Sequence, residues 1–176
     1  MDREIDRVNR FDAKDIERLE DQSLYSGFFG LEKRRLRHRR FNGEWGEVID
    51  REVHVRRDAV GVLLYDPIHD HVVLVEQIRA GALDDPVSPW KLEPVAGLVE
   101  PGETPADVAR REAQEEAGCD IGELIELHRY YPSPGACTEQ VTLFCGLIDS
   151  TGLGGIHGVE NEHEDILVHV MSFPEA

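Results

Sequence analysis

The segment from Gly97 to Cys119 constrains the fold of this 176-residue chain more than any other, because it combines loop and helix signals at fixed positions. Thr104 is a good N-cap residue and Pro105 a good first helical residue. Gly118 is a plausible C-terminal stop. The segment therefore predicts a loop, a helix between Thr104 and Gly118, and a second loop.

Two faces of this predicted helix differ in character. One face carries a narrow stripe of small side chains every four residues, at Ala109, Ala113 and Ala117. Such a stripe lets a helix lie close against a sheet. Another face carries three carboxylates three and four residues apart, at Glu112, Glu115 and Glu116. Because like charges repel, this face needs either water or a divalent cation beside it.

The charge of the chain limits its partners. Its 19 Lys and Arg residues against 36 Asp and Glu residues give a net charge of −17. This balance argues against a nucleic-acid backbone or an anionic membrane as the main partner. An anionic substrate would need local arginines and a bound metal ion.

The cysteines and the hydropathy pattern indicate a cytoplasmic protein. The three cysteines, Cys119, Cys137 and Cys145, have no metal-ligand spacing, so free thiols in a reducing compartment are expected. Residues 1–10 are charged and show no signal peptide, and the longest apolar runs have the length of strands, so no membrane span is expected.

Residues 1–55 are expected to form a small β appendage. Weak helical character is expected around Ile16 and Leu19. Asn42-Gly43 is a strong tight-turn dipeptide, and residues 33–41 and 45–55 on either side of it predict a hairpin.

Residues 56–176 are expected to form the main domain. Strands are predicted at residues 59–65, 72–77, 90–93, 124–131, 141–148 and 166–173. Residues 150–164 are rich in glycine and acidic residues and predict a mobile loop. Strands that alternate with one clear helix indicate a mixed sheet between helices.

The spacing of the central segment resembles the signature of the Nudix hydrolase superfamily. The matching positions are Gly97, Glu103, Arg111, Glu112, Glu115, Glu116 and Gly118. The resemblance implies an α+β fold, the α/β/α sandwich of that family. Similar proteins carry a further helix after the last strand; here the sequence stops at residues 174–176, so that helix is expected to be missing.

The resemblance also implies a metal site and its chemistry. Magnesium, with manganese as the second choice, would be held by Ala96 through its carbonyl oxygen and by Glu112, Glu116 and Glu164. Glu115 would help to hold the ions and their waters, and Arg111 and Glu103 would organise the site. In the resembling enzymes a flexible loop supplies the base that activates water; Glu162 is the match, Glu160 is the runner-up, and His163 ranks lower.

Further segments are similar to the ADP-ribose pyrophosphatases within this superfamily. These are residues 131–139, Phe28-Phe29, Arg51-Glu52 and residues 76–79. By this resemblance Arg79 holds a phosphate of the substrate. The adenine side would be formed by Phe28, Arg51 and Glu52, with Phe29 and Arg56 nearby; the ribose side would be lined by Leu98, Ser133, Pro134, Gly135 and Glu139.

The resemblance implies hydrolysis of ADP-ribose to AMP and ribose 5-phosphate by a homodimer that shares its N-terminal region across the interface. Three alternatives stay open. The chain could be a Nudix hydrolase of another nucleoside diphosphate derivative, such as a sugar nucleotide or a dinucleotide. It could be a Nudix-fold binding module without catalysis, although such a module would be expected to lose helix carboxylates. It could also be a truncated, weakly folded fragment.

Overall fold

The computed structural model describes residues 10–176 and divides them into two compact units. One unit comprises the N-terminal part of the chain up to Arg56 together with Ser133–Thr138, and the other comprises Arg57–Pro132 and Glu139–Ala176. The first nine residues of the expected β appendage lie outside the described range. Among residues 10–176, no helix combines the length and the apolar character needed to cross a membrane.

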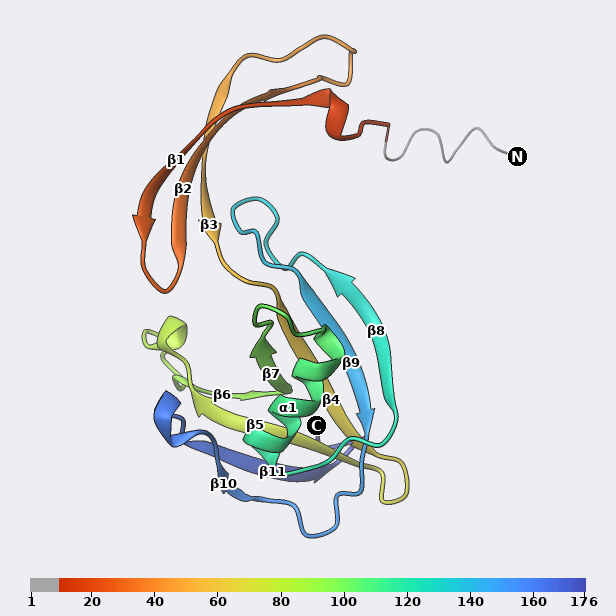
Figure 1. The fold of residues 1–176 in the computed structure, drawn as a ribbon. Helices are drawn as coiled ribbons and strands as arrows, with labels where there is room; N and C mark the ends of the chain where they lie inside the picture. The colour runs from red at the N-terminus through yellow and green to blue at the C-terminus, as the bar shows by residue number, and fades with distance from the viewer. Residues whose placement is uncertain (1–9) are drawn as a thin grey trace, which may run out of the picture. The chain divides into compact units, whose positions relative to one another are not determined.

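The N-terminal unit contains a three-stranded antiparallel sheet of β1 (Ile16–Ser26), β2 (Gly30–His38) and β3 (Ile49–Val55) (Figure 1). The predicted hairpin is confirmed, because β2 and β3 pair from Gly30 opposite Val55 to Leu36 opposite Ile49.

The prediction of helical character around Ile16 and Leu19 is wrong, because both residues lie in β1. This strand follows a short 3-10 helix at Ala13–Asp15. Pairing with β2 decides its conformation: Ile16 lies opposite His38, and the Glu17 carboxylate accepts a hydrogen bond from Arg37. Cross-strand contacts of this kind override a weak local helix preference.

The C-terminal unit is built on an eight-stranded mixed sheet. Its elements are β4 (Ala59–Asp66), β5 (His71–Ile78), β6 (Trp90–Glu93), β7 (Val95–Leu98), α1 (Pro105–Ala117), β8 (Leu124–Tyr130), β9 (Val141–Leu147), β10 (Gly155–His157) and β11 (Ile166–Ser172). The main path of the sheet runs β10-β11-β5-β4-β9-β8; β6 pairs with β5, and β7 pairs with β4. The pairing of β4 with β9 is parallel, and the others in this sheet are antiparallel.

Two strands of this sheet were not expected from the sequence. β7 follows Pro94 directly and is four residues long. β10 lies inside residues 150–164, which were predicted as one loop, and pairs Ile156 with Leu167 of β11. Both strands are too short to show a hydrophobic period of their own, so the tertiary pairing defines them.

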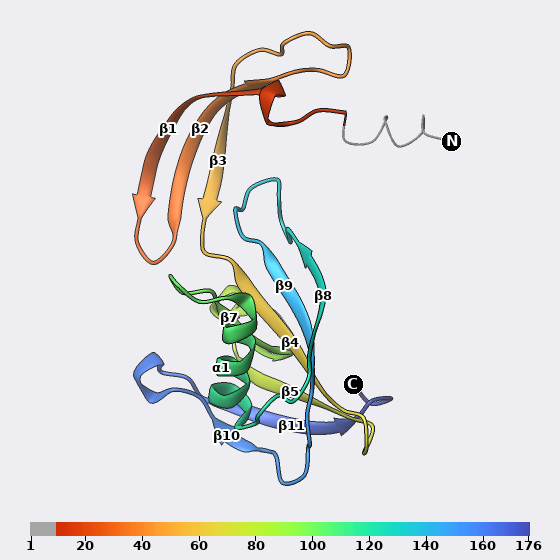
Figure 2. The same cartoon turned by 45° about the vertical axis from the view of Figure 1, so that its right-hand side comes forward.

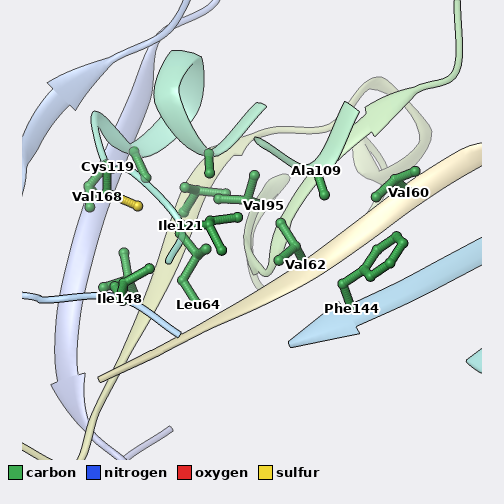
Figure 3. Packing of buried hydrophobic residues seen from close by; sticks show 14 of the residues in the cluster. Val60, Val62, Leu64, Val95, Ala109, Cys119, Ile121, Phe144, Ile148 and Val168 are labelled. Carbon is green, nitrogen blue, oxygen red and sulfur yellow. The ribbon is translucent and has the colours of Figure 1, made fainter. Parts of the chain in front are cut away.

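The core of this unit lies between α1 and the sheet. Figures 1 and 2 show α1 across one face of the sheet, and within residues 10–176 it is the one α-helix. The stripe of small residues faces the strands: Ala109, Ala113 and Ala117 are fully buried. Val60, Val62, Leu64, Val95 and Phe144 pack beneath the helix (Figure 3). The small side chains therefore let the backbone of α1 approach the sheet closely.

The buried Asp66 at the end of β4 links the turn that follows it to the loop at Ser150 after β9. Asp66 Oδ1 accepts hydrogen bonds from the backbone N–H groups of Ile68 (2.8 Å) and His69 (3.1 Å). Asp66 Oδ2 accepts from the Ser150 N–H (2.8 Å), the Ser150 hydroxyl (2.7 Å) and the His69 ring (2.8 Å). These donors hold the pKa of Asp66 well below its usual range, the Ser150 N–H most of all. Asp149 brings a further carboxylate close enough to form a metal-sized group with Asp66 and His69. The hydrogen bonds that already occupy both oxygens of Asp66 assign it a structural role.

Candidate active site

The helix that carries the glutamates begins and ends as its sequence predicts. The Thr104 hydroxyl accepts a hydrogen bond from the N–H of Asp107, and the Asp107 carboxylate accepts one from the N–H of Thr104, which forms a reciprocal capping box. Gly118 ends the helix with φ 62°, a left-handed conformation that suits glycine. A Cβ at Gly118 would also lie 2.6 Å from the His157 ring, so packing adds to the requirement for glycine.

Glu112 lies against the backbone of β7 at Gly97. A Cβ added to Gly97 would lie 1.8 Å from Glu112 Oε1 and 2.2 Å from its Cδ. The missing side chain of Gly97 therefore makes room for the carboxylate. This close approach gives the first glycine of the motif a physical role.

Glu116 is the most deeply buried carboxylate of the helix, with 2% of its surface exposed. Its Oε2 accepts a hydrogen bond from the backbone N–H of Ala96 (3.0 Å), and its Oε1 accepts one from the side-chain amide of Gln77 (3.3 Å). Sequence reasoning assigned no role to Gln77. Gln77 alternates with buried valines along β5, and an amide at such a position needs a hydrogen-bond partner. That pattern is the sequence signal that could have pointed to a role for Gln77.

Arg111 joins three of the acidic side chains. Its Nε and Nη2 donate to the two oxygens of Glu103 (2.9 and 3.2 Å), and its Nη1 donates to Glu112 (2.8 Å) and to Glu115 (2.9 Å). The hydrogen bond from Arg111 lowers the pKa of Glu103. The guanidinium thus fixes the carboxylates of Glu112 and Glu115 relative to each other.

Burial makes the charges of Glu112 and Glu116 costly. It raises the pKa of each carboxyl to about 7, and in each case a neighbouring carboxylate adds to the shift. The neighbour of Glu112 is Glu116, and that of Glu116 is Glu164. An all-oxygen set whose buried members are hard to ionise without a nearby cation fits a hard divalent ion.

The predicted base loop is attached to the end of α1. The N–H of Gly158 donates to the carbonyl oxygen of Glu115 (3.2 Å). Glu164 folds back so that its Oε2 accepts from the N–H of Val159 (3.0 Å). Glu160–Glu162 form a short 3-10 helix without buried residues, so Glu162 is exposed to solvent.

Some of the predicted substrate residues of the N-terminal unit, namely Phe28, Phe29 and Arg56, lie together near the end of β3. The Phe28 and Phe29 rings lie 4.7 Å apart, and the Arg56 guanidinium lies 5.0 Å from the Phe29 ring. Ser133, Pro134 and Gly135 belong to a turn whose Ala136 carbonyl accepts from the N–H of His54, the residue whose ring contacts Phe29. Arg51 and Glu52 lie further along β3, opposite Arg34 and Lys33 of β2. The structure thus brings Phe28, Phe29 and Arg56 into one aromatic and cationic cluster.

The predicted substrate residues of the C-terminal unit follow its strands. Arg79 comes directly after β5, its Nε donates to Glu93 (2.7 Å), and its charge acts on Glu116. Leu98 ends β7, opposite Ala59, and Glu139 lies two residues before β9. Arg79 therefore brings a positive charge from outside α1 near the buried Glu116.

A hollow of about 430 Å³ lies on the opposite face of the sheet. It is lined by Glu76, Ser88, Trp90, Ile156, Asp165 and Leu167. Glu76 and its partner Leu167 alternate with inward residues such as Val75 and Val168, so they point away from α1. The predicted metal ligands lie on the helix side and not in this hollow: Glu116 interacts with the charges of Glu112 and Glu164. Within residues 10–176 these three carboxylates do not all approach one another within 4.8 Å, as the ligand atoms of Asp66, His69 and Asp149 do.

Comparison with known proteins identifies the family of this chain. The NUDIX domain model matches residues 55–176, and the chain belongs to the NUDIX domain family. The chain is 43% identical to an ADP-ribose pyrophosphatase of Haemophilus influenzae over 177 residues, 99% of this chain and 82% of that protein. It is 45% identical to an ADP-ribose pyrophosphatase of Escherichia coli over 166 residues, covering 94% and 79%.

A relative that carries the name of a different pyrophosphatase has lower sequence identity to this chain. The chain is 33% identical to a GDP-mannose pyrophosphatase of Salmonella typhimurium over 161 residues, 88% of this chain and 81% of that protein. The family resemblance drawn from the central motif is confirmed, and the relatives with higher identity carry the name of the expected subfamily.

Proposed function

We propose that this protein hydrolyses the diphosphate of ADP-ribose to AMP and ribose 5-phosphate with magnesium as its cofactor and manganese as a substitute. One observation carries the proposal: two carboxylates, the half-buried Glu112 and the buried Glu116, lie against consecutive residues of β7, Gly97 and Ala96. Relatives of this chain at 43% and 45% identity are named ADP-ribose pyrophosphatases, which supports the choice of substrate.

The metal would be held by Glu112, Glu116, Glu164 and the carbonyl oxygen of Ala96. These are hard oxygen donors of the kind that magnesium prefers. When bound, the ion offsets the charge of the diphosphate and activates water at neutral pH. Arg111 holds Glu112 and Glu115 in place through its hydrogen bonds.

In the reaction we propose, Glu162 accepts a proton from the attacking water. The water oxygen forms a new bond to one phosphorus while the bond from that phosphorus to the bridging oxygen breaks. Arg79 binds a phosphate oxygen and offsets the negative charge that develops there. The exposure of Glu162 on a short 3-10 helix supports its role as a base that moves in with the substrate.

The nucleoside and ribose ends of the substrate would be bound by the remaining predicted residues. The flat faces of Phe28 and Phe29 suit adenine, with Arg51, Glu52 and Arg56 as polar partners. Leu98, Ser133, Pro134, Gly135 and Glu139 would line the ribose side.

We also propose that the protein is a cytoplasmic homodimer whose N-terminal regions are shared across the interface. Its three cysteines are free thiols, which supports a reducing compartment. The N-terminal sheet and its β1–β2 turn expose several large apolar side chains, namely Ile16, Leu19, Leu24 and Tyr25 in β1 and Phe28 in the turn. Exposed apolar groups of this kind are typical of an interface. Light scattering coupled to size exclusion should give twice the mass of the chain, and a monomeric mass at assay concentration would contradict the dimer.

A second candidate function is hydrolysis of a sugar nucleotide such as GDP-mannose, which the Salmonella typhimurium relative favours. Incubation with magnesium and a panel of nucleoside diphosphate sugars, followed by identification of the released nucleotide, separates the two. AMP from ADP-ribose at the highest kcat/KM supports the proposal. A preference for GDP-mannose favours the second candidate, and no release from any compound would indicate a binding module.

The role of Glu162 is tested by Glu162→Gln, with Glu160→Gln in the same exposed turn as the matched control. Loss of a general base is expected to lower kcat by about 100-fold or more while KM stays within a factor of about two. Glu160→Gln should keep nearly full activity. Full activity of Glu162→Gln, or a larger loss in Glu160→Gln, would contradict the assignment.

A further inference from the structure

Gln77 stands out as a buried amide in an apolar row. It lies on β5 and alternates with Val73 and Val75, which are both fully buried and face α1. Only 8% of the surface of Gln77 is exposed. A buried amide is costly unless it forms hydrogen bonds, so its partner shows what the position requires.

The partner of Gln77 is the deepest carboxylate of the helix. Gln77 Nε2 donates to Glu116 Oε1 at 3.3 Å, and the N–H of Ala96 donates to Glu116 Oε2 at 3.0 Å. The two donors come from different strands, β5 and β7, and each binds a different oxygen. Two anchors of this kind fix both the position and the rotation of the carboxylate, and each oxygen keeps a lone pair for another ligand.

The amide of Gln77 is uncharged, and this matters for a carboxylate that would bind a cation. Glu112 is held by the positive guanidinium of Arg111, which offsets part of its charge. Gln77 and the N–H of Ala96 hold Glu116 without adding a positive charge. Neither contact brings a countercharge to Glu116, whose charge burial makes costly, so a bound cation would stabilise that charge.

We propose that Gln77 is a positioning residue for the metal site, which orients Glu116 toward the bound ion. This inference rests on the proposed function, in which Glu116 is a ligand. Outer partners of metal-binding side chains are worth about 10–100-fold in metal affinity or activity. We expect a loss in that range when the amide donor is removed.

The test replaces Gln77 by Met, which has a similar length and no donor, and measures Mn²⁺ binding without substrate by the electron paramagnetic resonance signal of the free ion. Val73→Ala is the matched control, because it removes packing from the same buried row and no hydrogen-bond donor. We expect the Mn²⁺ dissociation constant to rise about 10-fold or more in Gln77→Met and to stay at the wild-type value in Val73→Ala. In the assay, the Mg²⁺ concentration for half-activation should rise in parallel, while KM for ADP-ribose at saturating Mg²⁺ stays unchanged.

Two further variants make the result decisive. Gln77→Asn retains an amide that is one methylene too short to reach Glu116, so it should lose affinity like Gln77→Met and serves if the latter does not fold. Glu116→Gln tests the metal site separately from the role of Gln77. If it loses Mn²⁺ binding while a folded Gln77 variant binds normally, the role of Gln77 is overturned and the metal site stands. If Glu116→Gln itself binds normally, the metal site is overturned and the role of Gln77 with it.

Discussion

The close approach of Glu112 to Gly97 makes Gly97→Ala an informative single change. The added methyl carbon would lie 1.8 Å from Glu112 Oε1, whereas ordinary contact begins at 3.4 Å. The carboxylate must therefore move by the difference, about 1.6 Å. Because the clashing atoms belong to the end of a flexible side chain, the strand and helix are expected to stay folded.

The expected cost follows from that displacement. A misplacement of about 1 Å in a catalytic arrangement can lower the rate by about 100-fold, which corresponds to about 2.7 kcal/mol of transition-state stabilisation. We expect Gly97→Ala to lower kcat/KM for ADP-ribose by at least this factor and to weaken Mn²⁺ binding. The midpoint of thermal unfolding should remain within about 5 °C of the wild-type value, because no buried group loses its packing.

Matched variants isolate the cause. Gly81→Ala adds the same methyl group in the same unit where no atom lies within 4 Å, and it should leave activity unchanged. In a cycle with Glu112→Ala, the double variant should be no worse than Glu112→Ala alone, because both changes act on one carboxylate. Wild-type activity and Mn²⁺ affinity in Gly97→Ala, or fully additive losses in the cycle, would refute the reasoning.

Two further predictions concern pH and the buried aspartate. Because the pKa values of Glu112 and Glu116 are raised to about 7, the folded state binds protons more tightly than the unfolded chain at these sites. The metal-free protein should therefore lose stability as the pH rises from about 4.5 to about 7, and Mg²⁺ should restore that stability at pH 8. The measurement is the midpoint of thermal unfolding at several pH values, with and without Mg²⁺. A midpoint that does not change with pH would contradict the prediction. Asp66→Asn removes a negative charge that accepts hydrogen bonds from Ser150 and His69, so it should lower the midpoint of thermal unfolding by about 5 °C or more at pH 7. This difference should shrink as the pH falls below about 4, where the carboxylate of the unfolded chain is protonated. Mn²⁺ affinity should stay unchanged, and a loss of Mn²⁺ binding in the folded variant would contradict a purely structural role.

The sequence contained enough information to predict α1 and the longer buried strands. The caps at Thr104 and Gly118 act within one helical turn, so local sequence determines them. Strands such as β4 and β5 are runs of buried apolar residues whose length and composition identify them. The spacing of the glutamates predicted the acidic face of the helix, and the family motif added the expected metal-binding role and Gly97. The structure shows why residue 97 must be glycine: a Cβ there would overlap Glu112.

Other features depend on contacts between distant residues and could not be read locally. β1 is a strand because basic β2 lies beside it, and β10 is a strand because it pairs with β11. The bond between Gln77 and Glu116 joins residues 39 positions apart, and neither residue alone predicts the other. Sequence reasoning finds such pairs only when it asks which buried amides lack a local partner.

The connection between Gly158 and the end of α1 has a consequence for evolution of the active site. One backbone hydrogen bond, from Gly158 to Glu115, ties the start of the acidic loop to the helix whose side chains would bind the ion. Apart from the proposed base Glu162, residues between Gly158 and Glu164 can therefore change in sequence while both ends of the loop keep their place, since Glu164 bonds back to Val159. Such an arrangement separates the part of the enzyme that can adapt to new substrates from the part that must stay constant.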